Sequence, residues 1–348
     1  YIKMITQLYG DHMRIANSAG CTHIWGGSPE IPFCTNDRGQ GVAWASGLFE
    51  DTAEYGYGMM LGTSAVRKWL RAEVEQLLPS ADAELQAAAE ACLAGWDDSH
   101  GTRERADRLV AALERVDSDA ARTILQRKDY LFKPSQWIVG GDGWAYDIGY
   151  GGLDHVIASG ENVNIICLDT EVYSNTGGQS SKATPTAAVA QFAASGKKTK
   201  KKDLGMMCMS YGYVYVAQVA MGYDPQQTLN AIREAEAYDG PSLIIAYAPC
   251  INHGIKGGMS NSQLRAKQAV EAGYWHCYRY NPELRGEGKN PFSLDSKAPT
   301  GSFRDFLMGE VRYSSLYRKF PEIADQLFAK AQRDAEERTE NYLRLAGK

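Results

Sequence analysis

Apolar residues along this chain gather into two kinds of pattern, short runs and stripes with helical spacing. The short, mostly apolar runs lie at residues 13–16, 135–139, 163–168 and 242–249. Runs of this length predict strands that are buried on both faces, as in a mostly parallel sheet. Between the second and third runs, apolar and small residues recur at helical spacing from Ala145 to Ile157, which predicts a helix. Strand, glycine-rich turn, helix and strand thus follow in the order typical of an α/β fold.

A different pattern begins near residue 64, where three helical stripes follow one another. They comprise Val66, Trp69, Leu70, Val74 and Leu77, then Leu85, Ala89, Cys92, Leu93 and Trp96, and last Leu109, Val110, Leu113 and Val116. Such stripes predict three amphipathic helices, separated by Pro79-Ser80 and by residues 97–101. We expect a helical insertion packed beside the sheet, and a protein-docking face is the alternative use of these helices.

Two more helices are predicted towards the C-terminus. Asp224 followed by Pro225 fits an N-cap and a first-turn proline, and Asp239-Gly240-Pro241 ends that helix before the strand at 242–249. Residues 321–345 form a charge-rich helical segment after a polar, proline-containing stretch. We expect this last helix to be exposed or to clasp a partner.

Composition and charge exclude several classes of protein. With 348 residues, of which 44% are hydrophobic, the chain has enough apolar material for a large core. A formal net charge of -5 argues against nucleic-acid binding, which needs a basic surface. No apolar run approaches the ~18 residues of a membrane span, and the first residues lack the features of a signal peptide. We expect a cytoplasmic protein without a membrane partner. The start at Tyr1, without Met and in a helical pattern, is that expected of a piece of a longer chain.

Candidate chemistry lies at the ends of two predicted strands. Gly141-Asp142-Gly143 follows one strand, and the segment from Thr170 to Asn175 follows the next. Glycines let a backbone turn approach an anionic group, and Asp142 supplies a hard oxygen ligand. The Thr170 hydroxyl, the Val172 carbonyl and the Asn175 amide are further partners for magnesium and phosphates. Ligands of open α/β sheets bind at the carboxyl ends of strands, so the two motifs together favour a diphosphate and magnesium site.

The seven cysteines, at positions 21, 34, 92, 167, 208, 250 and 277, contain no Cys-x-x-Cys pair. By spacing alone they predict neither a disulfide framework nor a metal site, and a buried cysteine is usually a small hydrophobe. Cys92, on an amphipathic helix, and Cys167, inside a strand, are interpreted in that way. Cys21 follows a small-residue turn after a strand, and Cys250 follows the strand at 242–249. These two cysteines are therefore placed where they could face the cofactor.

The spacing of Asp142 and Thr170 resembles the thiamine diphosphate fingerprint, with Thr170 where an Asn is usual. The string from Asp169 to Gln179 is similar to one family, the pyruvate:ferredoxin (or flavodoxin) oxidoreductases. The resemblance covers nearly the whole chain and looks like the carboxy-terminal part of the family's long chain. Its other motifs are Leu8-Tyr9-Gly10-Asp11, Ala16-Asn17-Ser18-Ala19-Gly20-Cys21, Ile24-Trp25-Gly26-Gly27, Leu48-Phe49-Glu50-Asp51, Tyr211-Gly212-Tyr213-Val214-Tyr215-Val216-Ala217 and Pro249-Cys250-Ile251-Asn252-His253-Gly254.

The resemblance implies roles for particular residues. Magnesium ligands would be Asp142, Thr170 and the Val172 carbonyl, and Asn175 would lie near the reacting carbons as a catalytic group. Cys21 and Cys250 would be two of four thiolates that hold a 4Fe-4S cluster, whose other two ligands come from a Cys-x-x-Cys pair upstream that this sequence lacks. We therefore predict that this chain alone cannot hold the cluster stably. The implied cofactor contacts are Cys21, Gly141, Asp142, Gly143, Trp144, Thr170, Val172, Tyr173, Ser174 and Asn175.

The resemblance also implies an architecture. We expect a mostly parallel, doubly wound α/β sheet of the thiamine diphosphate-binding type. Residues 1–62 would begin the cofactor-binding domain and carry a cluster cysteine, and residues 63–130 would form the helical insertion. Residues 131–300 would form the thiamine diphosphate and magnesium core, and residues 301–348 a helical tail.

The implied activity is the oxidative decarboxylation of pyruvate with coenzyme A to acetyl-CoA and CO2. Electrons would pass through 4Fe-4S clusters to ferredoxin or flavodoxin, and the remainder of the same chain, in a homodimer, would complete the enzyme. Three alternatives stay open. They are the equivalent part of another 2-oxoacid oxidoreductase, a non-oxidative thiamine enzyme, and an assembly module that is inactive when isolated.

Two further features have a structural and a functional interpretation. The run from Lys197 to Lys202 contains five lysines in six residues and predicts a solvated loop. Its functional alternatives are steering of an acidic electron carrier and contact with an anionic cofactor tail. His253 and His276 are isolated in the sequence, so we expect structural roles for both rather than general-base roles.

Overall fold

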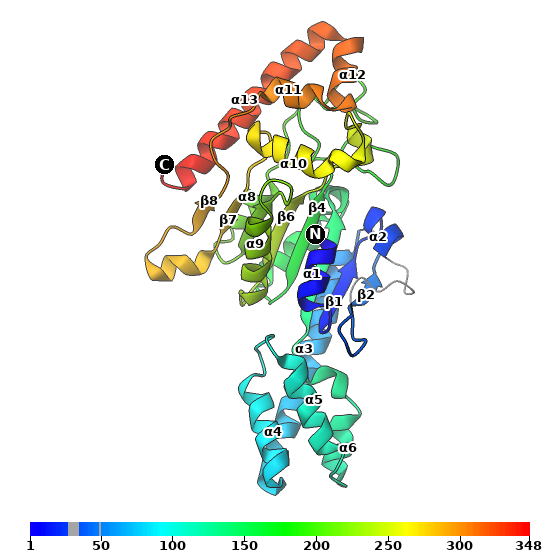
Figure 1. Ribbon diagram of the computed structural model, residues 1–348, viewed down its shortest axis with the longest axis vertical. Coiled ribbons are helices and arrows are strands. Elements are labelled where there is room, and N and C mark those ends of the chain that lie inside the picture. The colour runs from blue at the N-terminus through cyan, green and yellow to red at the C-terminus, as the bar shows by residue number, and fades with distance from the viewer. Residues whose placement is uncertain (27–34, 49) are drawn as a thin grey trace.

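The computed structural model describes residues 1–26, 35–48 and 50–348, which Figure 1 shows as a ribbon. Gly27, Cys34 and Phe49 lie outside the described residues. Within the described part, one sheet has the strand order β2-β1-β3-β4-β6-β5-β7-β8. The pairs from β2 through β5 are parallel, while β7 and β8 pair antiparallel at one edge. The predicted mostly parallel sheet is therefore confirmed. The strands are β1 Met13–Asn17, β2 Ala43–Ser46, β3 Ser135–Gly141, β4 Asn164–Asp169, β5 Tyr215–Val219, β6 Ser242–Tyr247, β7 Tyr278–Tyr280 and β8 Phe292–Leu294.

The strands are buried on both faces, which explains their apolar runs. Neighbouring side chains of one strand enter different cores, because successive side chains point to opposite faces. Ile165 packs into the core that contains helices α3, α7, α8 and α10, whereas Ile166 packs into the core under α1 and α9. Each buried isoleucine contributes roughly 1.5–3 kcal/mol relative to an exposed one. The helices are α1 Ile2–Tyr9, α3 Thr52–Leu77, α7 Tyr150–Ala158, α8 Leu204–Met209, α9 Pro225–Ala237 and α10 Ser262–Glu271. The doubly wound arrangement is confirmed.

The register of the parallel strands brings four chain segments to one edge of the sheet. In the ladder, Val139 lies opposite Asn17 of β1 and Ile166 of β4, and Ile166 lies opposite Ile244 of β6. Residues after β1, β3, β4 and β6 therefore emerge beside one another. This edge collects Cys21, the Asp142 turn, the loop that begins at Thr170, and Cys250.

The predicted helical insertion is a bundle with its own apolar core. The long helix α3 starts against β1 and β3 and runs out to pack on α4 Ala83–Ala94 and α6 Asp119–Leu125, while α5 Thr102–Leu113 packs on α4. Figure 1 shows this bundle below the sheet. The predicted stripes account for α3, α4 and α5, and the short α6 is an addition. Arg67 of α3 donates hydrogen bonds to the carbonyls of Trp96, Tyr130 and Leu131, which tie the bundle together.

The helix predicted from Ala145 to Ile157 is wrong in its continuity. The structure has a π-helical turn at Gly143–Ile148, followed by α7 from Tyr150. The fully buried Trp144 ring packs against Gly149, between the two helical segments, and only glycine fits there, because a Cβ at Gly149 would lie 2.1 Å from Trp144 Cδ1. π-turns of this kind are frequent at functional sites.

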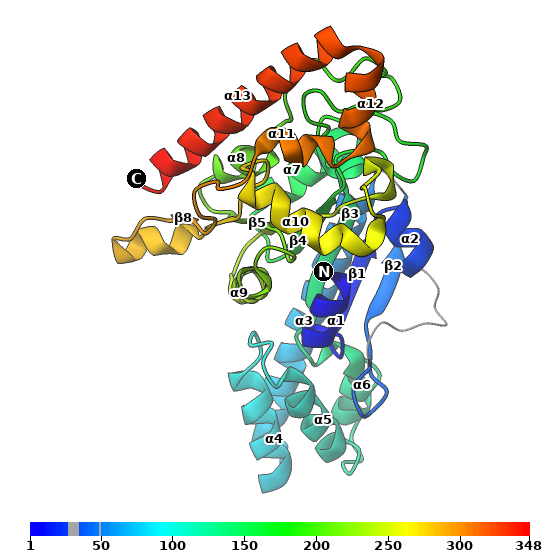
Figure 2. The same ribbon diagram turned by 45° about the horizontal axis from the view of Figure 1, so that its top comes forward.

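The C-terminal helix α13, Pro321–Leu345, has the predicted bounds but is not an exposed tail. Its apolar stripe is buried against its own chain, and the Tyr342 ring stacks on Phe292 of β8 with centroids 5.9 Å apart. Figure 2 shows α13 running above α11 Phe303–Met308 and α12 Val311–Lys319. The charge-rich sequence describes only the outer face of this helix. In the described residues, no helix combines the length and apolar character needed to cross a membrane.

Candidate functional site

A cavity of about 240 Å³ opens at the sheet edge where β1, β3, β4 and β6 end. Every residue predicted to contact the cofactor lines it, from Cys21 through the Asp142 turn to Asn175. Ala248, at the end of β6, lines it as well, while Cys250 lies just beyond. The remaining lining residues are Ala19, Gly20, Thr22, Leu168 and Thr176. The two strand-end motifs therefore share one cavity.

Three oxygen atoms from the predicted magnesium ligands converge in this cavity. Thr170 Oγ1 lies 2.7 Å from Asp142 Oδ1 and 3.0 Å from the Val172 carbonyl oxygen. One hydroxyl proton cannot serve both acceptors, so one of these contacts brings two oxygens together without a hydrogen bond. Neighbouring ligands of an octahedral magnesium ion, with bonds of 2.0–2.1 Å, lie about 3 Å apart. The oxygen spacing fits such an ion.

Asp142 is buried, and its carboxylate is held by neutral donors. The Thr170 N–H and hydroxyl donate to Oδ1, and the Ser181 hydroxyl donates to Oδ2 at 2.8 Å. Burial and the nearby charge of Asp169 raise the pKa of Asp142 to about 7. The charge of Lys201 offsets this rise only in part, and a divalent cation bound by these oxygens would supply a counter-charge in direct contact. No group of three or more His, Cys, Asp or Glu side chains is arranged for a metal in the part of the chain described. The candidate site instead combines a carboxylate, a hydroxyl and a carbonyl.

The loop after β4 owes its shape to one left-handed residue. Glu171 has a φ of 60°, which is costly for a residue with a Cβ. Its side chain turns away from the cavity and is buried against Arg312 and Tyr274, at 2.8 and 2.5 Å. Burial alone would raise its pKa, but the charges of Lys201 and Arg312 lower the pKa of Glu171 to about 2. The buried ion pairs therefore hold a strained turn that presents Thr170 and Val172 to the cavity.

Glycine is required where Tyr173 lies against the Asp142 turn. A Cβ at Gly143 would lie 2.5 Å from the Tyr173 ring. The missing side chain lets the loop after β4 approach the turn after β3 closely. This contact closes the cavity on one side.

Cys21 and Cys250 meet around Ser174. Cys21 is exposed, and its sulfur lies 3.5 Å from the Ser174 hydroxyl and 4.0 Å from Asn175 Oδ1. Cys250 is half-buried, hydrogen-bonds Ser174 and accepts the Asn252 N–H at 3.4 Å. Cys92, Cys167, Cys208 and Cys277 are buried, as the sequence predicts for the first two. Two thiols thus lie at the rim of the cofactor cavity.

The two histidines differ in their relation to the site. His276 is buried and hydrogen-bonds the Thr339 hydroxyl at 2.8 Å, far from the cavity lining. His253 donates its Nε2–H to the Thr170 carbonyl at 2.7 Å, and burial lowers its pKa to about 4, so it is neutral. Both have the expected structural roles, but His253 supports the candidate metal loop directly. The sequence gives no signal for that contact.

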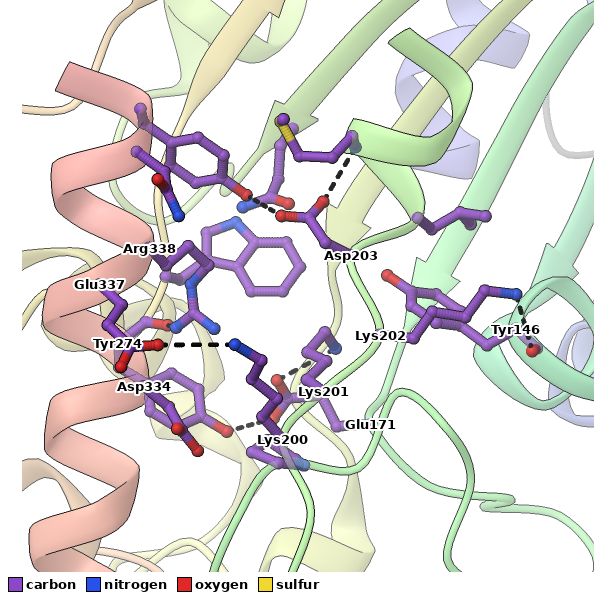
Figure 3. Close-up of a pocket in the computed structure, with 17 residues that line it drawn as sticks. Tyr146, Glu171, Lys200, Lys201, Lys202, Asp203, Tyr274, Asp334, Glu337 and Arg338 are labelled. Atoms are coloured by element: carbon purple, nitrogen blue, oxygen red, sulfur yellow. Dashed lines mark hydrogen bonds and ion pairs between the residues drawn. The ribbon is translucent and has the colours of Figure 1, made fainter. Parts of the chain in front are cut away.

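The predicted solvated loop at Lys197–Lys202 is confirmed for residues 198–200, which are exposed, and is wrong for Lys197, Lys201 and Lys202, which point inward. Figure 3 shows Lys200, Lys201 and Lys202. Lys201 is buried against Asp169 and Glu171, at 2.7 and 3.3 Å. Lys197 donates to the Ser181 and Thr184 carbonyls, and Lys202 donates to the Tyr146 carbonyl. Lys200 stays on the surface, 3.5 Å from Glu337. The run turns inward because two acids that flank Thr170 are buried and need counter-charges.

Sequence comparisons place this site among known proteins. Residues 131–246 match the family described as thiamine pyrophosphate enzyme, C-terminal TPP binding domain. The chain is 61% identical over 352 residues to a pyruvate-flavodoxin oxidoreductase of Klebsiella pneumoniae, covering 100% of this chain and 30% of the relative. It is 61% identical over 355 residues to a pyruvate:ferredoxin oxidoreductase of Moorella thermoacetica, covering 99% of this chain and 30% of that one. A mitochondrial NADP(+) pyruvate dehydrogenase of Euglena gracilis is 45% identical over 350 residues, covering 99% of this chain and 19% of the relative.

A solved structure is a more distant match. It is a 2-oxoglutarate:ferredoxin oxidoreductase of Magnetococcus marinus, with 2-oxoglutarate, coenzyme A and succinyl-CoA bound, at 16% identity and a TM-score of 0.41. The match covers 86% of this chain and 77% of that one. The chain spans about 30% of the length of the two bacterial oxidoreductases that are 61% identical to it. By sequence, it therefore corresponds along its whole length to one part of the pyruvate-flavodoxin and pyruvate:ferredoxin oxidoreductases, the part that contains the thiamine pyrophosphate-binding domain.

Proposed function

We propose that this chain provides the thiamine diphosphate and magnesium site of an oxidoreductase that converts pyruvate and coenzyme A to acetyl-CoA and CO2. The observation that carries the proposal is the convergence of the Asp142, Thr170 and Val172 oxygens in a cavity that the Cys21 thiol also lines. The names of the relatives at 61% identity support pyruvate as the substrate. Because the chain spans 30% of those relatives, the activity would belong to a longer protein.

Different residues of the cavity would bind different parts of the cofactor. Asp142, Thr170 and the Val172 carbonyl would hold the magnesium ion that neutralises the cofactor's diphosphate. Gly141 leaves the turn open to the phosphates, since a Cβ there would meet only one atom within 4 Å, at 3.9 Å, while Gly143 lets the Tyr173 ring close against the turn. Trp144 and Leu168 supply apolar walls that exclude water from the bound cofactor.

Thiamine diphosphate, when bound, supplies a nucleophilic carbon for the 2-oxo group of pyruvate and takes up the electron pair left by the departing CO2. Asn175 lines the same cavity and would hydrogen-bond charge that develops on the substrate, which makes it the candidate catalytic residue of this chain. Its Oδ1 lies 4.0 Å from the Cys21 sulfur, which supports a position between the reacting carbons and the proposed cluster.

The two cysteines at the rim would provide two of the four thiolate ligands of a 4Fe-4S cluster. Such a cluster needs four thiolates, and Cys21 and Cys250 are two that meet around one residue, Ser174. Oxidation of one pyruvate releases two electrons, which the cluster would pass on singly to ferredoxin or flavodoxin. The remaining two thiolates would come from the longer protein, which we propose to be a cytoplasmic homodimer. Iron and sulfide analysis of the 348-residue chain alone should therefore give far less than four of each.

One alternative has specific support, which is a different electron acceptor, since a relative with 45% identity is named for NADP(+). Another 2-oxoacid as the substrate is a second hypothesis. An inactive assembly module is a third, and it predicts no cofactor binding.

Calorimetry on the full-length protein tests the proposal. Thiamine diphosphate should bind only with magnesium, and Asp142→Ala should weaken binding at least 100-fold, because the buried diphosphate would lose its metal. Pyruvate should then reduce the cluster in the wild-type protein, as followed by its absorbance. Thr176→Ala is the matched control at the cavity wall and should change affinity less than threefold. Binding that is independent of magnesium would sink the assignment of the metal site.

A further inference from the structure

Lys201 joins two segments of the candidate metal site on the side away from the cavity. The segments contain residues 169–171 and residue 183. The Lys201 ammonium donates to Asp169 Oδ2 at 2.7 Å, Glu171 Oε1 at 3.3 Å and the Ala183 carbonyl at 3.0 Å. Figure 3 shows the side chain reaching inward to Glu171, while Lys200 reaches to Glu337 on α13. The Lys201 side chain is 11% exposed, and both acids are at most 1% exposed. All three protons of the ammonium therefore have a buried partner.

The first segment held by Lys201 presents two of the metal oxygens. Asp169 and Glu171 flank Thr170, and the Glu171 N–H closes the turn on Asp169 Oδ1 at 3.1 Å. Val172 follows directly. An ammonium that fixes the two acids thus fixes the direction of the Thr170 hydroxyl and the Val172 carbonyl.

The second segment orients the third metal oxygen. Ala183 lies two residues after Ser181, whose hydroxyl holds Asp142 Oδ2 at 2.8 Å. Lys197 strengthens the same segment by donating to the Ser181 carbonyl at 2.7 Å and to the Thr184 carbonyl at 2.5 Å. Thr184 in turn donates its hydroxyl to the Glu171 carbonyl at 2.6 Å. The two segments are therefore tied to each other and to the lysine run.

The surroundings of Lys201 suit a lysine in particular. Its ammonium lies 5.2 Å from the centre of the Tyr146 ring and 5.4 Å from that of Trp275. The three acceptors belong to three different residues, which matches the three donors of a compact ammonium better than the planar fork of an arginine. Burial lowers the pKa of Lys201, but the two carboxylates outweigh it and raise the pKa above the usual value.

We propose that Lys201 is a positioning residue of the magnesium and diphosphate site, which it holds in its binding geometry by clamping residues 169–171 to residue 183. The inference rests on the proposed function, because it assigns a role towards the cofactor bound there. Lys201 does not line the cofactor cavity, so it acts through the loop and not by contact. The lysine run thereby has a function that differs from carrier steering.

Magnesium-dependent binding of thiamine diphosphate to the full-length protein tests this inference. Lys201→Met removes the clamp and should raise both the Kd for thiamine diphosphate and the magnesium concentration for half-saturation at least tenfold. Lys200→Met is the matched control and should change neither value more than twofold, because Lys200 is exposed. A merely structural role would lower the unfolding midpoint but leave the magnesium requirement unchanged in the folded protein.

A second variant covers the case in which an unpaired buried carboxylate prevents folding. Lys201→Met combined with Asp169→Asn removes one positive and one negative charge, so the buried net charge stays that of the wild type. This double variant should show the same raised magnesium requirement. A folded double variant or single variant with wild-type affinity and magnesium dependence would overturn the inference. Failure of the wild-type protein itself to bind the cofactor with magnesium would instead overturn the proposed function, and this inference with it.

Discussion

The two sides of the loop after β4 are built from different chemistry. The cavity side offers Asp142 and neutral oxygens to a ligand, with no cation among the residues that line it. The far side holds full charges in a buried network, in which Arg312 pairs with Glu171 and Glu310, and Lys201 pairs with Asp169 and Glu171. The charges of the far side are paired within the protein, whereas on the cavity side the proposed magnesium ion would supply the counter-charge. The groups that would contact a ligand and the charged network that holds them thus lie on opposite sides of one short loop.

The largest expected effect on stability comes from the far side. Arg312→Met would leave Glu171 and Glu310 short of a buried counter-charge, and breaking such pairs costs about 3–5 kcal/mol. We expect a loss of that size in the urea-unfolding free energy of the cofactor-free protein. Arg304→Met is the matched control, because its partner Asp325 is 55% exposed and Arg304 itself 51% exposed. Equal losses of unfolding free energy in the two variants would contradict the proposed difference between the two sides of the loop.

The next largest expected effect is a difference in how the two sides of the loop change the protein's stability with pH. Glu171 has a folded pKa of about 2, below its ordinary 4.5, so its stabilising contribution is present above pH 4.5 and is lost as the pH falls towards 2. Asp142 has a folded pKa of about 7, above its ordinary 3.8, so its contribution is present below pH 3.8 and is lost as the pH rises through 7. Each amounts to something on the order of 3 kcal/mol.

Thermal unfolding of the cofactor-free protein between pH 2 and 8 measures both contributions. Asp142→Asn should match the wild type near pH 4 and be the more stable protein at pH 8. Glu171→Gln should be less stable than the wild type at pH 7, with a gap that narrows as the pH falls from 4.5 towards 2. Parallel profiles for the two variants would contradict the contrast. Saturating magnesium and thiamine diphosphate should remove the advantage of Asp142→Asn, because the wild-type carboxylate then has its counter-charge.

The sequence predicted the cavity side of the loop better than the far side, because the cavity side is built from local motifs and the far side from long-range contacts. Strand-end motifs such as Gly141-Asp142-Gly143 combine turn residues with a carboxylate, and the strands before them are buried on both faces, so both signals are local. The bounds of α13 and the mostly parallel character of the sheet follow from such local patterns, whereas the order of the strands does not. The clamp of Lys201 on Asp169 joins residues 32 positions apart, and a lysine run predicts a solvated surface unless the fold brings buried acids to it.

Other elements were not predictable for the same physical reason. The short helix α6 has two fully buried apolar residues, Ala121 and Ile124, too few to form a stripe. The break in the helix after Asp142 depends on where the Trp144 ring packs. The inner face of α13 depends on partners such as Phe292, far away in the chain. Tertiary packing decides each case, and a local pattern does not encode it.

The smallest expected effect concerns Ser174, which lies where the cavity side meets the cysteines. Its hydroxyl is 3.5 Å from the Cys21 sulfur and also hydrogen-bonds Cys250. Hydrogen bonds to cluster sulfurs raise the reduction potential, because they stabilise the added negative charge of the reduced state. Ser174→Ala should therefore lower the midpoint potential of the proposed cluster in a redox titration of the full-length protein followed by electron paramagnetic resonance.

The shift should be partial, because the Asn252 N–H remains as a donor to Cys250 at 3.4 Å. Ser174→Thr keeps the hydroxyl and is the control that should retain the wild-type potential. Affinity for thiamine diphosphate should change far less in both variants than in Asp142→Ala, since the magnesium oxygens come from Asp142, Thr170 and Val172. An equal loss of affinity in the two variants, with no change in potential, would place Ser174 on the cofactor and not on the electron path. A lowered potential with intact affinity would instead show that Ser174 acts on electron transfer and not on cofactor binding.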